Sequence, residues 1–237
     1  MLDGRPLIDA HQHPVRLPTV KPAWLDWAER YGQPGWRDAY RSDGMIIPAA
    51  FDGLMRAEGV DHALVICEYS PKATGTQPAE DLLPLVRHNP ARFSLIANLN
   101  PHLHYPPGDE LADPALLIPV LRDFPELTVV LAHGGRGWWY DTAASLALLH
   151  ENVWIELSGL PPHRLPHYYA RFELTKLARK FIFGTDWPGV PGIARNARAL
   201  AGLGLDEDVL AGVLAGHAIS VYPGLANMLQ RLDVTPS

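Results

Sequence analysis

Residues 6–14 read PLIDAHQHP, an apolar run that ends in two histidines separated by one residue. We predict a strand over Pro6–Ala10, followed directly by His11 and His13. Residues i and i+2 of an extended chain point to the same side, so both imidazoles can approach one ion. Imidazole suits zinc, iron, manganese or nickel. The pair is weak evidence by itself, because the chain has 11 histidines and a second such pair at His102 and His104.

Five further apolar runs follow along the chain. They are His62–Cys67, Phe93–Asn98, Leu127–Ala132, Val153–Leu157 and Phe181–Gly184. Runs that are apolar throughout and rich in β-branched residues are typical of strands buried on both faces of a parallel sheet. Helical periodicity separates them, at residues 46–58, 113–124, 141–150, 172–179, 193–203 and 206–215. Alternating strands and helices predict an α/β fold with right-handed crossovers.

The sequence supplies about six strands, whereas a closed β/α barrel needs eight. Between Asn98 and Leu127 there is room for one connection and one helix only. We therefore predict a TIM-barrel-type (β/α) barrel that is incomplete or distorted, with about six parallel strands. No internal repeat or second-domain linker is visible, so residues 1–237 are predicted to form a single domain.

Two later strands also end in titratable side chains. The apolar run at 129–132 leads into His133, and the run at 181–184 leads into Asp186. A titratable group at the mouth of an apolar strand is costly without a partner. Because β/α folds build their sites at the carboxyl ends of their strands, we expect these two residues to converge with His11 and His13 on one divalent metal.

Three strings together resemble a known family. They are IDAHQHP at 8–14, VVLAHGGRGWW at 129–139 and FIFGTDWPGVPGI at 181–193. They look like the amidohydrolase-related group of the amidohydrolase superfamily, which includes metal-dependent hydrolases and nonoxidative decarboxylases of the aminocarboxymuconate semialdehyde type. The resemblance implies a (β/α)₈ barrel with His11 and His13 as metal ligands. It implies that His133 is the catalytic histidine and that Asp186 is a metal ligand or proton shuttle.

One departure from this family concerns the ligand set. Members carry a fourth strand and then a fifth that ends in a metal-binding histidine, and nothing like the fifth-strand motif follows Asn98. The spacing is what the loss of two βα units would leave. His11, His13 and Asp186 still supply three ligands, a workable number for a catalytic site. His133 is a candidate for the fourth, and His102 and His104 are weaker substitutes.

The leading functional prediction is a metal-dependent hydrolase that acts on a small carbonyl- or carboxylate-bearing substrate through a metal-activated water. Zinc is the first choice of metal, with manganese or iron as alternatives. Asp186 and His133 would move the protons. One alternative is a nonoxidative decarboxylase of a small aromatic or unsaturated acid. A second is a catalytically impaired remnant that binds metal or ligand.

Several other residues are weaker candidates. Glu68 follows the second strand and is either a pocket residue or simply solvated. Arg136 beside two tryptophans can hold a carboxylate, although loop packing is the simpler interpretation. Ser158 lacks a neighbouring His–Asp pair in the sequence, which argues against a nucleophile. The aromatic segment Trp24–Tyr40 is expected to be a long loop that caps a pocket or packs on the surface.

Composition limits the partners. The net charge is −6 and basic residues do not cluster, which argues against nucleic acid and anionic membranes as partners. The single cysteine, Cys67, excludes an internal disulfide and suits a reducing compartment. With no signal sequence and no long apolar run in evidence, we expect a cytoplasmic protein, possible as a homodimer, whose partner is a small-molecule substrate.

Overall fold

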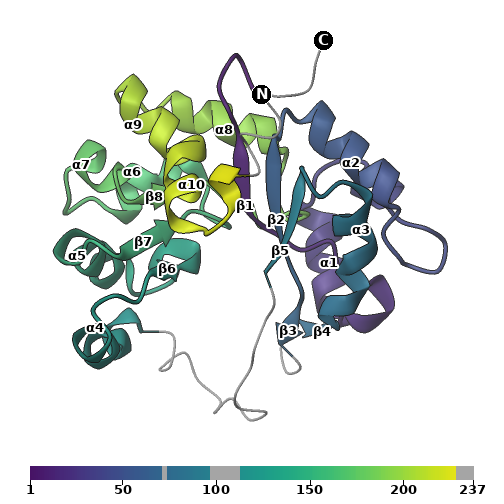
Figure 1. Cartoon of the computed structure of the whole chain (residues 1–237), viewed down its shortest axis with the longest axis horizontal. Helices are drawn as coiled ribbons and strands as arrows, with labels where there is room; N and C mark the ends of the chain where they lie inside the picture. The colour runs from purple at the N-terminus through teal and green to yellow at the C-terminus, as the bar shows by residue number, and fades with distance from the viewer. Residues whose placement is uncertain (71–73, 97–112, 228–237) are drawn as a thin grey trace.

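The computed structural model describes residues 1–70, 74–96 and 113–227. His102 and His104 therefore lie outside the described residues. Six parallel strands form two sheets of three (Figure 1). The first sheet has the order β1-β2-β5, with β1 at Ile8–Gln12, β2 at His62–Ile66 and β5 at Phe93–Ile96. The second has the order β6-β7-β8, with β6 at Val129–Leu131, β7 at Val153–Glu156 and β8 at Phe181–Ile182.

The two sheets meet along what we call the β1–β8 seam, which comprises residues 10–13 and 183–187. The backbone N–H of Ala10 donates to the carbonyl of Phe183 at 3.1 Å, and that of His13 donates to the carbonyl of Trp187 at 2.9 Å. In the other direction, the N–H of Asp186 donates to the carbonyl of His11 at 2.9 Å. The strands thus run in the spatial order β5-β2-β1-β8-β7-β6.

The barrel is open between β5 and β6. No strand pairing joins these two strands among the described residues. They are the strands that flank the short spacing noted in the sequence. The predicted incomplete barrel with about six parallel strands is therefore confirmed.

The first strand lies two residues later than Pro6–Ala10, because it begins at Ile8 and continues through His11 to Gln12. Pro6 has no N–H with which to extend the ladder, whereas Gln12 pairs with Val65. The other five strands lie within their predicted runs. His11 is therefore part of the strand, where its carbonyl accepts from the N–H of Asp186, and does not belong to a following loop.

Helices cover the outside of the two sheets. They are α1 (Pro22–Tyr31), α2 (Pro48–Ala57), α3 (Leu83–His88), α4 (Ile118–Asp123), α5 (Tyr140–Leu149), α6 (Leu165–Tyr168), α7 (Leu174–Ala178), α8 (Ile193–Ala201), α9 (Glu207–Ala211) and α10 (His217–Val221). The segment before α4 begins as the sequence predicts: Asp113 accepts a hydrogen bond from the N–H of Ala115 at 2.9 Å, with Pro114 in the first turn. None of the described helices is long and apolar enough to cross a membrane.

The loop prediction for Trp24–Tyr40 is wrong, since most of that segment is α1 and a 3₁₀ turn at Trp36–Ala39. Trp24 and Ala28, four residues apart, bury one face of α1. The end of this segment contacts the protein interior: Tyr40 stacks on the buried Trp187, with ring centroids 6.4 Å apart. This segment therefore supports the β1–β8 seam from outside.

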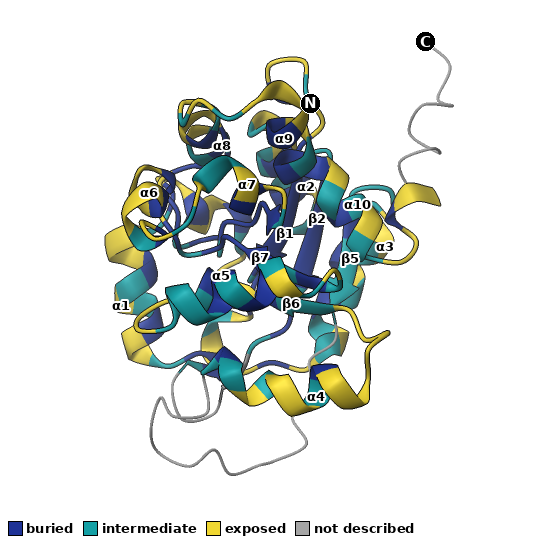
Figure 2. Ribbon diagram, turned by 90° about the vertical axis from the view of Figure 1, so that its left-hand side faces the viewer, coloured by how far each residue is buried: buried dark blue, intermediate teal, exposed yellow. Residues whose placement is uncertain are grey.

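A hydrophobic cluster separate from the main core packs α10 and the turn before it against the strands. Each parallel strand contributes at least one side chain: Ile8 and Ala10 from β1, then Leu64, Ile96, Val130, Trp154 and Ile182. These contact Ala215, Ala218 and Leu225. Figure 1 shows α10 between the two sheets, and Figure 2 shows that β1, β2 and β7 are almost wholly buried. The C-terminal segment thus supplies apolar contacts to all six staves of the open barrel.

Candidate metal centre

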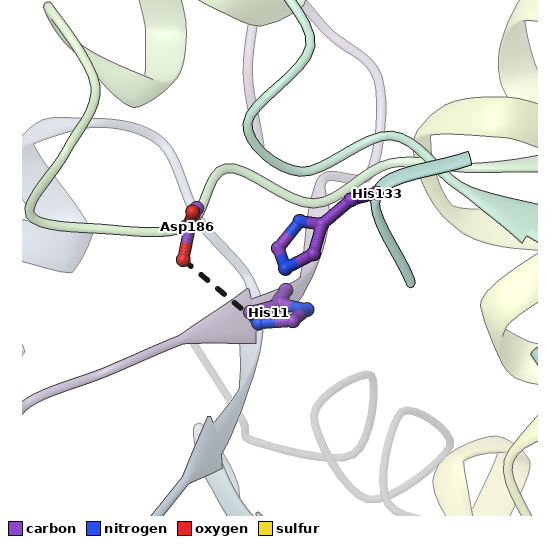
Figure 3. A group of neighbouring side chains, drawn as sticks. All are labelled: His11, His133 and Asp186. Carbon is purple, nitrogen blue, oxygen red and sulfur yellow. Dashed lines mark ion pairs between the residues drawn. The ribbon is translucent and has the colours of Figure 1, made fainter. Parts of the chain in front are cut away.

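Three side chains from the two sides of the β1–β8 seam converge. Nε2 of His11 lies 3.0 Å from Nε2 of His13. Oδ1 of Asp186 lies 3.9 Å from the first of these nitrogens and 3.7 Å from the second. Figure 3 shows Asp186 facing His11 across the seam. The ligand atoms predicted from three separate positions in the sequence therefore face one common point.

His133 lies beside this group. His11, His133 and Asp186 (Figure 3) each offer one ligand atom, and these three atoms lie within 4.8 Å of one another. The rings of His11 and His133 have centroids 4.9 Å apart. The structure thus brings together all four of the site residues named from the sequence.

Two of these residues have an unusual backbone conformation. His133 has a φ of 59° and Asp186 a φ of 66°, in the left-handed region that non-glycine residues rarely occupy. Each follows directly after the end of an apolar strand, where the left-handed turn redirects the chain. Strain of this kind persists only where surrounding contacts enforce it, and it clusters at functional sites.

A buried carboxylate clamps the seam next to Asp186. Asp9 is fully buried on β1 and accepts hydrogen bonds from Oγ1 of Thr185 at 2.5 Å and from its N–H at 3.0 Å. Gln12 donates a third, at 2.8 Å. Burial raises the pKa of Asp9 to about 6, although these hydrogen bonds oppose the shift. The clamp fixes the position of Thr185, and hence of Asp186, relative to β1.

A second buried carboxylate lies behind His11. Oε2 of Glu156 is 3.0 Å from Nδ1 of His11, and Glu156 is 1% exposed. It also accepts hydrogen bonds from the N–H and the hydroxyl of Ser158, both at 2.6 Å. A carboxylate on the rear nitrogen of a histidine fixes the tautomer and directs the lone pair of Nε2 forward, as second-shell partners of metal ligands do.

Asp9 and Glu156 were not among the residues predicted for the site. They lie inside two of the predicted strands, Asp9 within Pro6–Ala10 and Glu156 within Val153–Leu157. The available signal was a lone acidic residue within an otherwise apolar run, which is expensive to bury without partners. Some of the partners, Thr185 for Asp9 and His11 for Glu156, come from distant segments, so the pattern alone does not name them.

Burial and charge set the protonation of the histidines. Burial would lower the pKa of His11, but the carboxylates of Glu156, Asp186 and Asp9 outweigh it and raise that pKa. Burial lowers the pKa of His13 to about 4, with a further contribution from the neighbouring charge of His11. Burial also lowers the pKa of His133. The metal-free pair of His11 and His13 therefore takes up one proton readily and resists a second.

The donor set fits a divalent cation. Two donors each about 2.1 Å from one ion can lie at most about 4.2 Å apart, and the three separations among Nε2 of His11, Nε2 of His13 and Oδ1 of Asp186 all fall below this limit. Two imidazoles with one carboxylate form a recognised catalytic zinc set. The buried carboxylate of Glu156 on Nδ1 of His11 also agrees with the second-shell partner that such a ligand usually has.

Charged side chains and small residues surround the centre. Oε2 of Glu68 lies 3.8 Å from Nδ1 of His13. The half-exposed Arg136 places Nη1 4.0 Å from Oδ2 of Asp186. Gly159, with a φ of 66°, leaves room for both, since a Cβ there would lie 2.5 Å from Arg136 Nη1 and 3.3 Å from Asp186 Oδ2.

A cavity of about 430 Å³ adjoins His133 and Arg136. Apolar side chains including Leu117, Leu131 and Trp139 line it. Its volume falls within the range of small-molecule sites. The candidate centre therefore has space beside it for a small ligand with an apolar part.

Comparison with known proteins places this geometry in a family. Residues 102–224, more than half of the chain, match the family described as amidohydrolase. No curated protein matches the chain. Solved structures show the same fold at low identity. An uncharacterized TIM-barrel protein from Bordetella bronchiseptica aligns with a TM-score of 0.70 and 15% identity, covering 94% of this chain and 99% of that one.

Two other similar structures contain metals. An amidohydrolase from Burkholderia multivorans with bound zinc aligns with a TM-score of 0.58 and 16% identity, over 92% of this chain and 99% of that chain. A dihydroxybenzoic acid decarboxylase from a Polaromonas species, with bound manganese and an inhibitor, has a TM-score of 0.56 and 14% identity, over 92% and 96%. Both resemble this chain in fold. The protein therefore belongs to the amidohydrolase family.

Proposed function

We propose that this protein is a metal-dependent hydrolase of a small carbonyl- or carboxylate-bearing substrate. The observation that carries the proposal is the convergence of His11, His13 and Asp186 on one point, with the buried Glu156 behind His11. A structural role alone does not require two imidazole Nε2 atoms 3.0 Å apart to face a carboxylate. Liganding of one cation accounts for all three orientations.

His11, His13 and Asp186 would hold the metal, and zinc is the first choice because imidazole and carboxylate ligands suit it. The zinc in the Burkholderia multivorans amidohydrolase supports this choice, and the manganese in the Polaromonas decarboxylase supports manganese as the alternative. His133 lies beside this ligand set, and its one free nitrogen is assigned to proton transfer rather than to the metal.

When bound, a divalent cation at this point would lower the pKa of a water molecule and polarise a substrate carbonyl. His133 is suited to move the proton. Its Nδ1 is engaged by Ser158 at 2.8 Å, which leaves Nε2 as its free nitrogen, and its lowered pKa keeps the ring neutral near pH 7. Nε2 therefore accepts the proton of the attacking water and returns it to the leaving group. Asp186 keeps Oδ2 as a second proton acceptor.

Arg136 supports a substrate with a negative charge. Its guanidinium is half exposed and lies beside both Asp186 and the adjacent cavity. A carboxylate that entered the cavity would meet it. This observation also favours the second candidate function, a nonoxidative decarboxylase. An assay of small aromatic acids, lactones and amides that measures both CO₂ release and bond hydrolysis separates the two.

Metal analysis of the purified protein tests the proposal directly. We expect close to one zinc or manganese ion per chain after reconstitution, and a marked loss in His11→Ala and His13→Ala. Added zinc at 100 times its dissociation constant should stabilise the wild-type fold by about 2.7 kcal/mol. Less than about 0.2 ion per chain after reconstitution would instead support the impaired-remnant alternative.

A further inference from the structure

The hydroxyl of Ser158 lies between two side chains of the metal centre. Its Oγ is 2.8 Å from Nδ1 of His133 and 2.6 Å from Oε2 of Glu156. The same Oε2 atom is 3.0 Å from Nδ1 of His11. Ser158 is fully buried. One continuous hydrogen-bonded chain therefore connects the rear nitrogens of His133 and His11.

The chemistry of these groups fixes the direction of each bond. An ionised carboxylate only accepts, so the Ser158 hydroxyl and the Nδ1–H of His11 both donate to Glu156. The hydroxyl has one proton, and its oxygen is left to accept from Nδ1–H of His133. The carbonyl of Ser158, 3.0 Å from the same Nδ1, can only accept as well. Both histidines therefore carry a proton on Nδ1, and the neutral ring of His133 has its lone pair on Nε2.

We propose that Ser158 is a positioning residue that couples His133 to Glu156 and keeps Nε2 of His133 unprotonated for the metal centre. His133 needs such a tether because it lies beyond the end of β6 in a left-handed conformation, where no strand ladder orients its ring. The importance of this coupling for catalysis rests on the proposed function. The hydrogen-bonded chain itself belongs to the metal-free protein.

Long-range ¹⁵N–¹H correlation spectra of the histidine rings in the metal-free full-length chain test the inference. In the wild type, His133 should give the neutral Nδ1–H pattern, and Nδ1 of His11 should be protonated as well. In Ser158→Ala, the backbone carbonyl of residue 158 still accepts from Nδ1–H of His133, so the tautomer should persist. The Nδ1–H proton has lost its hydroxyl acceptor, so its signal should move upfield and exchange faster with water, while His11, still bound to Glu156, should not change. An unaltered shift and exchange rate of the His133 Nδ1–H in this variant would overturn the proposal, as would an Nε2–H pattern for His133 in the wild type.

A matched control is available on β5. The hydroxyl of Ser94 lies 3.0 Å from Nε2 of His62, and Nδ1 of His62 lies 2.9 Å from the carbonyl of Ala91. Ser94→Ala removes the same group next to another histidine and should leave His133 unchanged. In Ser158→Ala, an unchanged His62 signal shows that the fold is intact.

Zinc binding separates this inference from the proposed function. Ser158→Ala should weaken zinc binding by about tenfold, as loss of second-shell contacts does. If the wild type binds no zinc but shows the expected tautomers, the proposed function fails and the role of Ser158 in orienting His133 stands. If the wild type binds zinc and Ser158→Ala leaves both His133 and the affinity unchanged, the positioning role fails and the proposed function stands.

Discussion

Nδ1 of His11 lies 3.0 Å from Oε2 of Glu156, and the two side chains are 9% and 2% exposed. This contact joins β1 of one sheet to β7 of the other, across the seam that closes the two halves of the open barrel. It also decides which nitrogen of His11 faces the metal centre. The contact therefore has both a structural and a chemical consequence, and the two can be measured separately.

Glu156→Gln should weaken zinc binding by about 10- to 100-fold. The amide oxygen can stay on the N–H of Ser158, which then turns the amide NH₂ toward Nδ1 of His11. The amide NH₂ and the Nδ1–H of His11 would then be two donors facing each other. His11 would have to carry its proton on Nε2 instead, the nitrogen whose lone pair would bind the metal. Calorimetric zinc titration measures the effect. Glu58→Gln, which changes a carboxylate bound to Gln33 and the N–H of Ala194, should leave the affinity unchanged.

His133→Gln should lower kcat by about 10²- to 10⁴-fold, the usual contribution of a general acid–base residue. Zinc content should remain close to one ion per chain, because His11, His13 and Asp186 are retained. Steady-state kinetics together with metal analysis provide the measurement, and the exposed His163→Gln is the matched control. A loss of zinc in His133→Gln would instead identify this histidine as an indispensable ligand.

Gly159→Ala should lower zinc affinity, whereas Gly204→Ala should not. Both glycines have left-handed backbones, with φ of 66° and 76°, so each substitution should cost about 1–2 kcal/mol of stability. Only at Gly159 would the new Cβ press on Arg136 and Asp186, since nothing lies within 4 Å of a Cβ at Gly204. Urea unfolding and zinc titration of both variants make the comparison. Equal zinc affinities would contradict the placement of Gly159 against the centre.

The metal-free protein should lose stability as the pH falls from about 6.5 to 4 because of His13. Burial lowers its folded-state pKa to about 4, while an unfolded histidine titrates near 6.5. Between these values the unfolded chain binds more protons, so stability falls with pH, by up to about 3 kcal/mol.

Urea unfolding at several pH values should show a shallower acid loss for His13→Gln than for the wild type. Asp9 acts in the opposite direction over much of this window, because its raised pKa of about 6 makes the native state hold a proton that the unfolded state releases. The difference between the two proteins is therefore the informative quantity. Parallel curves for both proteins would show that His13 does not stay neutral in the native state.

The sequence was most informative where a local pattern has a local cause. Five of the six strands lie within their predicted runs, because an apolar β-branched run is enough to specify a buried strand. The convergence of His133 and Asp186 with the histidines of β1 was predictable as well, since parallel strands end at a common edge.

The missed features depend on contacts between distant segments. Glu156 is one acidic residue in an apolar run until β1 places His11 against it, and no spacing rule connects the two. Similarly, the aromatic segment Trp24–Tyr40 was expected to be a long loop, whereas much of it is α1. The helix is stable because its aromatic face packs on segments that follow much later in the sequence.

The seam between β1 and β8 also has a consequence for folding order. Asp9 and Thr185, which clamp it, are 176 residues apart in the chain. Such a contact can form only when the two ends of the chain have been brought together, at a loop-closure cost. Since His11 and Asp186 come from opposite sides of this clamp, zinc affinity would appear only after the N-terminal strand has docked on the C-terminal half. During refolding, the arrival of metal binding would thus report the docking of the two halves of the chain.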